Sequence, residues 1–389
     1  MSSPSPKTSP IDPVALSQAL IRVPSVTPDQ GDCLNVLKDA LEGMGFTCHM
    51  LLMQTDGAED VMNLYARYGT GGKNFCFAGH TDVVPVGVED HWTKAPFGAE
   101  IKDGILYGRG ASDMKAAIAC FTAAASRIIA SDFMNGHSLS FLITGDEEGP
   151  AINGTKRVLD WLVDQGEKLD LCLVGEPTNP HQLGEMMKIG RRGSLHGYLT
   201  AKGTQGHVAY PHLAHNPIPD LVKLLSHLEG ALDDGNNHFQ PSNLEVVKIS
   251  ATNDSDNIIP GEAKAQFNVR FSSEFTPEAL KDHLTHRLDK AATPYQIDWW
   301  VSGDSFLTQP GILTDAITKA CEKYLGKTPE LSTTGGTSDA RFIKNMCPVV
   351  EFGLVGATMH KVNESCAVDD IHMLTDIYTD IIQYIFKES

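Results

Sequence analysis

Hydrophobic residues recur with helical or strand spacing along most of this chain. Apolar positions three and four apart predict helices in VALSQALIRV and CLNVLKDALEGMGF, and again over residues 114–130 and 154–166. Short continuous apolar runs predict buried strands in NLYARYG, NFCFAGH, SLSFLITGD and DLCLVGE. Because these strands alternate with helices, the sequence predicts an α/β domain with a mixed sheet flanked by helices.

The pattern changes between residues 192 and 305. RRGSLHGYLTAKG, SNLEVVKISA, EAKAQFNVRFSS and YQIDWWVSG read as strands, with helices predicted in NPIPDLVKLLSHLEGALDD and TPEALKDHLTHRLDKA. This β-α-β-β-α-β order is typical of a ferredoxin-like α+β domain. The α/β pattern resumes at 306, so we expect 192–305 to be inserted into a discontinuous domain of residues 13–191 and 306–389. The Ser/Pro-rich residues 1–12 are predicted to be a disordered tail.

Net charge and cysteine content limit the kinds of partner and the cellular compartment that we expect. The formal net charge of −18 over 389 residues argues against nucleic acid or an anionic membrane surface as a partner. The chain contains no apolar run of the roughly 18 residues that a membrane span needs. Its 8 cysteines are scattered without a CxxC pair, which is typical of reduced thiols. We therefore expect a cytoplasmic protein with a small-molecule substrate.

Residues able to bind a metal or move a proton follow the predicted strands of the α/β domain. They stand at the ends of NFCFAGHTD, LSFLITGDEE, LCLVGE and PVVEFGLVGATMH, and are His80, Asp82, Glu147, Glu148, Glu176 and His360. Asp113, in GRGASDM, precedes the helix predicted at 114–130. Ligands collect at the carboxyl ends of strands in open α/β sheets, so these side chains are expected to converge. Two histidines and several carboxylates favour zinc or a similar ion, and hence metal-assisted hydrolysis.

Each of these residues also has an ordinary interpretation. His80 is one of 15 histidines, and Asp113 would serve as a helix N-cap. Glu147 and Glu148 would form a solvated acidic turn, although two adjacent acids at a buried strand end would repel without a cation. Asp82 could accept the second N–H of a metal-bound His80. The hypothesis of a metal site rests on the occurrence of all these residues together, and not on any one of them.

Other chemistries receive less support. YGRGASDM lacks the third glycine of a dinucleotide-binding loop and the Gly-Lys-Ser/Thr ending of a phosphate loop. Ser338, in TTGGTSDARF, is not surrounded by the G-x-S-x-G pattern of a serine hydrolase. The glycines and hydroxyls of that stretch are better interpreted as hydrogen-bond donors to a substrate carboxylate.

Five stretches, FAGHTDVVPVG, LYGRGASDMKAA, TGDEEG, GEPT and HKVNE, resemble in their order and spacing the zinc-dependent M20 peptidase and deacylase family. The resemblance covers the chain from about residue 13 and implies a zinc-peptidase-like fold. It implies two Zn²⁺ ions per subunit, for which Co²⁺ can substitute. His80 and Glu176 would hold one ion. Glu148 and His360 would hold the other, and Asp113 would bridge the two.

The same resemblance implies the remaining roles. Glu147 would be the general base, Asp82 would support His80, and His207, in QGHVAYP, would reach the developing oxyanion across a homodimer. The inserted domain would act as a lid and dimerisation domain. The implied reaction is hydrolysis of an amide between a succinyl group and an amino acid; a deacetylase, another aminoacylase or a dipeptidase of the family stays open, as does a non-catalytic relative. Candidate substrate-binding residues are Arg191, Tyr210, Asn257, Arg270, Gly336, Thr337 and Ser338.

Overall fold

A computed structural model describes residues 10–251, 253 and 255–388 of the chain. The first nine residues of the predicted tail lie outside this range. Of the rest, Ile11 donates its backbone N–H to Ser126 Oγ at 3.0 Å, and the Asp12 side chain caps the first helix. The chain forms two compact units. Unit 1 comprises the described residues up to Ile189 together with 308–332 and those from Ser338 onward, and unit 2 comprises 190–307 and 333–337.

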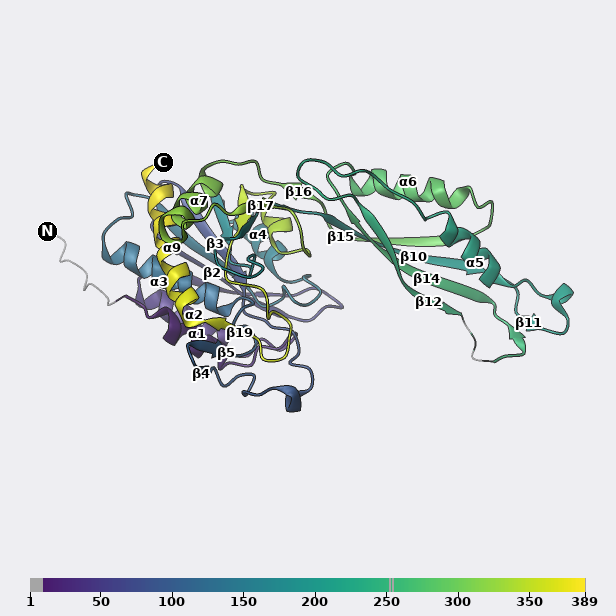
Figure 1. Ribbon diagram of the computed structural model, residues 1–389, viewed down its shortest axis with the longest axis horizontal. Coiled ribbons are helices and arrows are strands. Elements are labelled where there is room, and N and C mark those ends of the chain that lie inside the picture. Colours follow the sequence, from purple (N-terminus) through teal and green to yellow (C-terminus); the bar gives the residue numbers. More distant parts are fainter. Residues whose placement is uncertain (1–9, 252, 254, 389) are drawn as a thin grey trace. The chain divides into compact units, whose positions relative to one another are not determined.

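Unit 1 is built around one eight-stranded sheet (Figure 1). Its strands, in their order across the sheet, are β1 (Thr47–Met53), β2 (Val61–Tyr68), β6 (Ser138–Thr144), β3 (Asn74–His80), β7 (Leu171–Val174), β18 (Val349–Glu351), β8 (Met186–Lys188) and β17 (Glu330–Ser332). The four central strands β6, β3, β7 and β18 run parallel, whereas β1 and β2 are antiparallel to their neighbours. The carboxyl ends of the four parallel strands therefore lie along the same edge of the sheet.

Helices cover both faces of this sheet, as the sequence predicts. They are α1 (Pro13–Ile21), α2 (Cys33–Gly43), α3 (Lys115–Ala130), α4 (Thr155–Asp164), α7 (Ile312–Leu325), α8 (Ala340–Ile343) and α9 (Val368–Lys387). Phe121 of α3 packs edge-on against Phe141 of β6, with ring centroids 5.4 Å apart. Trp161 of α4 packs against Tyr65, which pairs with Leu142 in the sheet. Because consecutive strand residues point to opposite faces, α3 and α4 lie on opposite sides of the sheet.

A small three-stranded sheet adjoins this layer structure. It contains β4 (Ile101–Lys102), β5 (Ile105–Tyr107) and β19 (Ser365–Ala367), in the order β19-β5-β4. The short helix η1 (Glu89–His91) precedes it in the chain. Pairing of β5 with β19 joins the strand that leads into the loop before α3 to a segment about 260 residues later.

Unit 2 has the predicted β-α-β-β-α-β order. Its elements are β10 (Gly193–Lys202), α5 (Pro217–Ser226), β12 (Asn243–Ala251), β14 (Glu262–Phe271), α6 (Pro277–Asp289) and β15 (Gln296–Gly303). The antiparallel sheet has the order β12-β14-β10-β15, which is a ferredoxin-like arrangement. Alternate residues of β10 and β14 join the leucines of α5 and α6 in one core.

Three short pieces of unit 2 contain or adjoin candidate site residues. They are the strand pair β9 (Gly190–Arg191) and β16 (Phe306–Leu307), the pair β11 (Gly206–His207) and β13 (Ile258–Ile259), and η2 (Pro211–Leu213), which Tyr210 precedes. The segment Thr333–Thr337 also clusters with unit 2, although the sequence placed it with the α/β domain.

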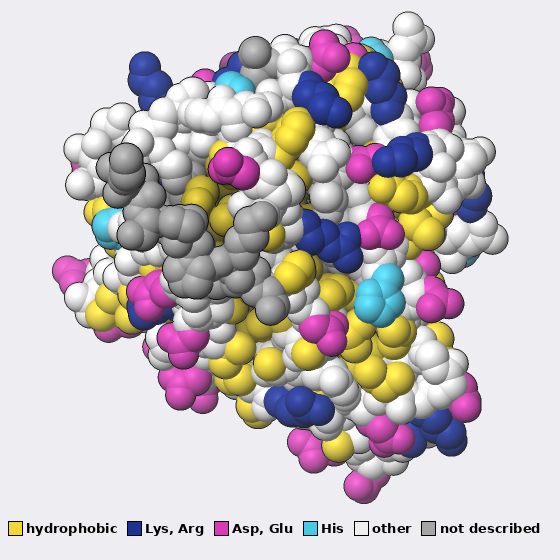
Figure 2. Space-filling view, turned by 90° about the vertical axis from the view of Figure 1, so that its left-hand side faces the viewer, with side chains coloured by type: hydrophobic (Ala, Val, Ile, Leu, Met, Phe, Trp, Pro, Cys, Tyr) yellow, Lys and Arg dark blue, Asp and Glu magenta, His cyan; other side chains and the backbone are white. Residues whose placement is uncertain are grey.

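One face of the protein carries charges of both signs (Figure 2). Figure 2 shows Asp and Glu side chains interspersed with Lys and Arg, with hydrophobic side chains between them. The eight cysteines are free and seven are buried. Within the part of the chain that the structure describes, none of the helices combines the length and hydropathy that crossing a membrane requires.

Candidate metal centre and active site

Three adjacent parallel strands of unit 1 end at predicted metal ligands. β3 ends on His80 itself, β6 is followed by Glu147 and Glu148, and β7 is followed by Glu176. Since these strands are neighbours and run in the same direction, their ends deliver the side chains to one edge of the sheet, as the sequence predicts.

Two loops bring the remaining predicted ligands to the same place. Asp113 ends the loop between β5 and α3, and His360 lies in a turn after β18, where its φ of 60° is left-handed. Glycines make room for the Asp113 loop against the sheet. A Cβ on Gly79 would lie 2.4 Å from Met114 Cε, and one on Gly175 would lie 2.6 Å from the same atom. The absence of a side chain at these two positions therefore makes room for the side chain of Met114, which follows Asp113 in the chain.

Five of these side chains form two groups that share Asp113. One group is His80, Asp113 and Glu176, and the other is Asp113, Glu148 and His360; within each, the ligand atoms lie within 4.8 Å of one another. The two oxygens of Asp113 face different groups, since Oδ1 lies 3.2 Å from His80 Nε2 and Oδ2 lies 3.1 Å from His360 Nε2. His360 Nε2 also lies 2.9 Å from Glu148 Oε1, and His80 Nε2 lies 3.8 Å from Glu176 Oε1. Asp113 thus has the geometry of a bridging carboxylate.

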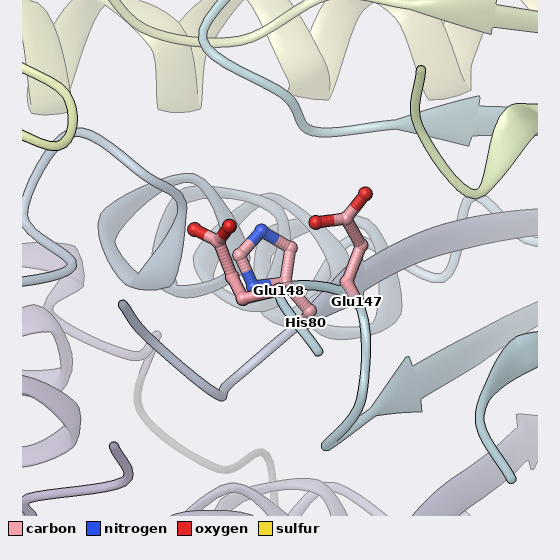
Figure 3. Close-up of side chains that lie close together, drawn as sticks. All are labelled: His80, Glu147 and Glu148. Atoms are coloured by element: carbon pink, nitrogen blue, oxygen red, sulfur yellow. The ribbon is translucent and has the colours of Figure 1, made fainter. Parts of the chain in front are cut away.

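Glu147 stands beside these groups. Figure 3 shows the His80 ring with the carboxylates of Glu147 and Glu148 on either side of it, and the ligand atoms of the three lie within 4.8 Å of one another. Glu147 is absent from the two groups that share Asp113. Glu147 thus lies next to the two groups that share Asp113 without belonging to either, although with His80 and Glu148 it forms a third group that could hold a metal ion.

The electrostatics of this site favour a bound cation. Burial, together with the neighbouring Glu176, raises the pKa of Glu147 well above that of an ordinary glutamate. Hydrogen bonds to Asp113 and Glu148 raise the pKa of His360 to about 10. Although burial opposes ionisation, hydrogen bonds with His360 and His80 hold the pKa of Asp113 well below its usual range. The carboxylates thus attract positive charge, which a metal ion would supply in place of the histidine protons.

The tautomer of His80 also suits metal binding. Its Nδ1 lies 2.9 Å from the backbone oxygen of Asp82, which can only accept a hydrogen bond, so Nδ1 carries the proton. Nε2 then presents its lone pair towards Asp113 and Glu176. A mixed N/O donor set of two histidines and three carboxylates fits two divalent ions such as zinc.

Asp82 makes different contacts from those the sequence suggests. The Asp82 carbonyl is nearer to His80 Nδ1 than its carboxylate, which lies at 3.6 Å. The fully buried carboxylate instead accepts hydrogen bonds from the backbone N–H groups of Glu147 at 3.2 Å and Glu148 at 3.0 Å. Burial raises the pKa of this carboxyl to about 6. Asp82 therefore contacts His80 with its main-chain carbonyl and the acidic turn with its side-chain carboxylate.

We expect Asp82→Asn to lower kcat about 10- to 100-fold, because the amide would turn one N–H donor towards the main-chain donors of the acidic turn. Steady-state kinetics with the proposed substrate and metal content by mass spectrometry would measure the effect. Asp90→Asn, an exposed position on η1, is the matched control. Unchanged kcat in Asp82→Asn would show that the acidic turn does not depend on these two hydrogen bonds.

Three predicted residues of unit 2 lie together at the β11–β13 pair. His207 pairs with Ile258, and Val208 donates its N–H to the Asn257 carbonyl at 3.1 Å. The rings of His207 and Tyr210 meet edge-to-face, with centroids 5.7 Å apart. The exposed His207 accepts a hydrogen bond at Nδ1 from Ala209 N at 3.0 Å, which leaves its Nε2 as the protonated nitrogen in the neutral ring.

The other predicted substrate contacts fall into separate places. Arg191 donates to the Thr334 carbonyl at 3.3 Å and so lies beside the segment that contains Gly336 and Thr337. Arg270 is on β14, opposite Ser194. Ser338 belongs to unit 1, where its buried hydroxyl donates to Glu351 Oε1 at 2.5 Å. The hydroxyl of Ser338 is therefore already engaged within the protein.

One residue that contacts the Asp113 loop was not predicted from the sequence. The buried Glu364 carboxylate accepts hydrogen bonds from the loop that carries Asp113. The sole sequence signal was its presence in HKVNE, four residues after His360, and this stretch contributed only to the family resemblance.

Comparisons with known proteins show the family and the fold of this chain. The sequence profile described as Peptidase family M20/M25/M40 matches residues 76–384. Succinyl-diaminopimelate desuccinylase from Rhodospirillum centenum is 55% identical over 96% of this chain and 97% of its own length. The M20 metallo-carboxypeptidase Sso-CP2 from Sulfolobus solfataricus has the same fold, with a TM-score of 0.80, 20% identity and coverage of 97% of this chain and 99% of that one.

A second solved structure is the YXEP protein of Bacillus subtilis, described as a dinuclear metal-binding peptidase of the M20 family. It has a TM-score of 0.71 at 14% identity and covers 97% of this chain and 98% of its own. The family match spans most of the sequence and contains the metal-binding groups found in the structure. The chain belongs to peptidase family M20/M25/M40 and is a hydrolase with a candidate two-metal site.

Proposed function

We propose that this protein removes succinate from N-succinyl-LL-2,6-diaminopimelate, giving LL-diaminopimelate for lysine and cell-wall precursor synthesis. The observation that carries the proposal is the pair of metal-binding groups joined by Asp113, with Glu147 beside them. The desuccinylase relatives, 52% to 55% identical over nearly the full chain, support this substrate over N-acetylornithine. The free cysteines fit a reducing cytoplasm.

Two Zn²⁺ ions are the proposed cofactor, and Co²⁺ can substitute because it accepts the same donors. His80, Glu176 and Asp113 would hold one ion, and Glu148, His360 and Asp113 would hold the second. When bound, the ions polarise the amide carbonyl and lower the pKa of water.

The protein's own residues supply the proton transfers. Glu147 takes a proton from the attacking water and returns it to the departing amine nitrogen, so that the carboxylate is regenerated at the end of each turnover. Asp82 holds the main chain of Glu147 in place. His207, with a protonated Nε2, donates a hydrogen bond to the oxyanion, an interaction worth about 3 kcal/mol at the transition state.

The substrate carries several carboxylates, and these need local cationic and amide donors because the whole protein has a net charge of −18. Arg191, Arg270, Tyr210 and Asn257 of unit 2 are the proposed side-chain donors. Gly336, Thr337 and Ser338 supply donors from one continuous segment, with Ser338 using its backbone N–H because its hydroxyl is bound to Glu351. Unit 2 is thus the proposed lid over a catalytic domain formed by unit 1, and lid closure would gate turnover.

The direct test compares kcat/KM for N-succinyl-LL-diaminopimelate and N-acetylornithine with the zinc-loaded protein. The acetyl substrate lacks the extra carboxylate of the succinyl group, so its binding would leave hydrogen-bond donors of the protein unpaired. We therefore expect kcat/KM to be about 100-fold or more higher for the succinyl substrate. Cleavage of the acetyl substrate alone would keep the chemistry and overturn the proposed substrate.

We also propose a homodimer formed through unit 2. β12 is the edge strand of its sheet and exposes Val247 and Ile249, with exposed fractions of 64% and 63%. α5, which packs on the neighbouring strands β14 and β10, exposes Val222 at 61%. Among the described residues, β12 pairs in this sheet only with β14, so its free edge, which carries Val247 and Ile249, is suited to pairing with the same edge of a second copy. In such a dimer His207 would act in the partner's site.

Ile249→Lys should convert the dimer into a monomer, because a charge on the edge strand opposes pairing. Light scattering after size-exclusion chromatography would measure the mass, and kcat should fall with dissociation. Val163→Lys on α4 is the matched control, since Val163 is 65% exposed in unit 1. A monomeric Ile249→Lys protein with full kcat would refute a catalytic role for His207 across the dimer.

A further inference from the structure

Glu364 is a buried carboxylate whose two oxygens are both occupied by one loop. Oε1 accepts hydrogen bonds from the backbone N–H groups of Ser112 at 2.9 Å and Asp113 at 3.0 Å. Oε2 accepts from Gly110 N at 3.1 Å and from the guanidinium of Arg109 at 2.8 Å. The Glu364 side chain is 1% exposed. Four donors therefore converge on a carboxylate that has no access to a substrate.

The loop that encloses Glu364 cannot easily hold its shape alone. It joins β5 to α3, and Gly110 in it has a φ of 87°, which favours glycine. A Cβ at Gly110 would lie 2.9 Å from Val83 Cγ1, so the loop also lies close to the side chain of Val83, three residues after His80. Without the carboxylate, three inward-pointing N–H groups would be buried without an acceptor, at a cost that favours another loop conformation.

Arg109 extends the same arrangement to the other segments that carry ligands. One guanidinium nitrogen donates to Glu364 and, at 3.2 Å, to the Lys361 carbonyl, next to His360. The other donates to the Pro85 carbonyl at 3.2 Å, on the segment that begins with His80. The pair therefore joins the segments of His80, Asp113 and His360, which come from three distant parts of the sequence.

Resting on the proposed two-metal function, we propose that Glu364, with Arg109, is a positioning residue for the metal pair. It fixes the backbone of Asp113 so that one carboxylate oxygen faces each metal-binding group. The pair contacts neither substrate nor the proposed ions; it acts through Asp113. Loss of this support would weaken metal binding and the hydrolytic step while leaving substrate affinity nearly unchanged.

Glu364→Gln is the main test, because the amide keeps the size of the side chain but turns a donor towards N–H groups. We expect Zn²⁺ affinity, measured by competition with a chelator in the absence of substrate, to fall about 10- to 100-fold. The visible spectrum of the Co²⁺-loaded protein should change, kcat should fall in parallel, and KM should stay within about twofold. Excess Zn²⁺ should restore part of the lost kcat.

Glu167→Gln is the matched control for loss of a largely buried carboxylate. Glu167 lies in unit 1 and accepts hydrogen bonds from Tyr65 at 2.8 Å and Asn74 at 3.2 Å, away from the ligand segments. It should lower the melting temperature and leave the Zn²⁺ affinity and the Co²⁺ spectrum unchanged. Arg109→Lys is the second test variant. It keeps the positive charge but loses the guanidinium that donates on both sides, and we expect a smaller fall in Zn²⁺ affinity than in Glu364→Gln.

Wild-type Zn²⁺ affinity, Co²⁺ spectrum and kcat in Glu364→Gln would overturn the positioning role. If Glu364→Gln does not fold, the same result in Arg109→Lys would overturn it. A failure of the proposed function looks different. If the wild-type protein hydrolyses a different acyl amino acid, the proposed substrate is wrong. The comparison of Zn²⁺ affinity among the variants would still hold, because it is made without substrate.

Discussion

Glu147→Gln should lower kcat about 10²- to 10⁴-fold while the protein keeps its full metal content. The reason is that an amide cannot accept the proton of the attacking water or return it to the amine. Glu147 is absent from the two groups that share Asp113, so its replacement should leave those ligands in place. Steady-state kinetics and metal analysis by mass spectrometry on the same preparation would measure both quantities.

Glu89→Gln is the matched control, because Glu89 is exposed on η1 and the substitution makes the same chemical change. Its kcat should equal that of the wild-type protein. A Glu147→Gln protein with near-normal kcat would show that another group removes the proton. Loss of metal from the same variant would instead make Glu147 a ligand.

Asp113→Asn should have the second large effect, because Asp113 contributes an oxygen to both metal-binding groups. The amide has one acceptor oxygen and no charge, so the pair should lose its shared ligand. We expect the weaker ion to be lost at micromolar Zn²⁺ and kcat to fall about a thousandfold, equivalent to roughly 4 kcal/mol. Equilibrium dialysis followed by metal analysis would give the number of ions per chain.

Asp160→Asn, at an exposed position of α4, provides the comparison for Asp113→Asn. It should bind the same number of ions as the wild-type protein. Two tightly bound ions per chain in Asp113→Asn would contradict the bridging role that the two oxygen–nitrogen distances support.

The sequence predicted the strand-end ligands because their signal is local. An apolar run followed at once by His80, by Glu147 and Glu148, or by Glu176 shows both the strand and the residue at its end. The parallel order of β6, β3 and β7 then brings these residues together. The same logic reached His360, although it lies nine positions after the end of β18.

Contacts between main chain and buried acids were not predictable in the same way. Asp82 precedes the acidic turn by 65 positions and binds its amides, and Glu364 follows the Asp113 loop by 251 positions and binds its amides. Backbone N–H groups look alike in any sequence, so no residue pattern marks them as partners. A buried acid in such a place looks like a surface acid until the fold is known.

Weak local signals in the sequence also explain why two features of the fold were not predicted. β1 (Thr47–Met53) has no clean alternation of apolar and polar residues, because it is an edge strand that is only partly covered. Thr333–Thr337 follows a strand of unit 1 in the chain but clusters with unit 2, where Arg191 binds the Thr334 carbonyl. That assignment depends on a contact about 140 residues away, which the local sequence does not encode.

Zinc titration of the metal-free protein, with turnover of N-succinyl-LL-diaminopimelate followed at each step, tests the two-metal hydrolase most directly. We expect the metal-free protein to be inactive, binding to saturate at about two ions per chain, and activity to return as the ions bind. Turnover that survives thorough removal of metal would contradict it.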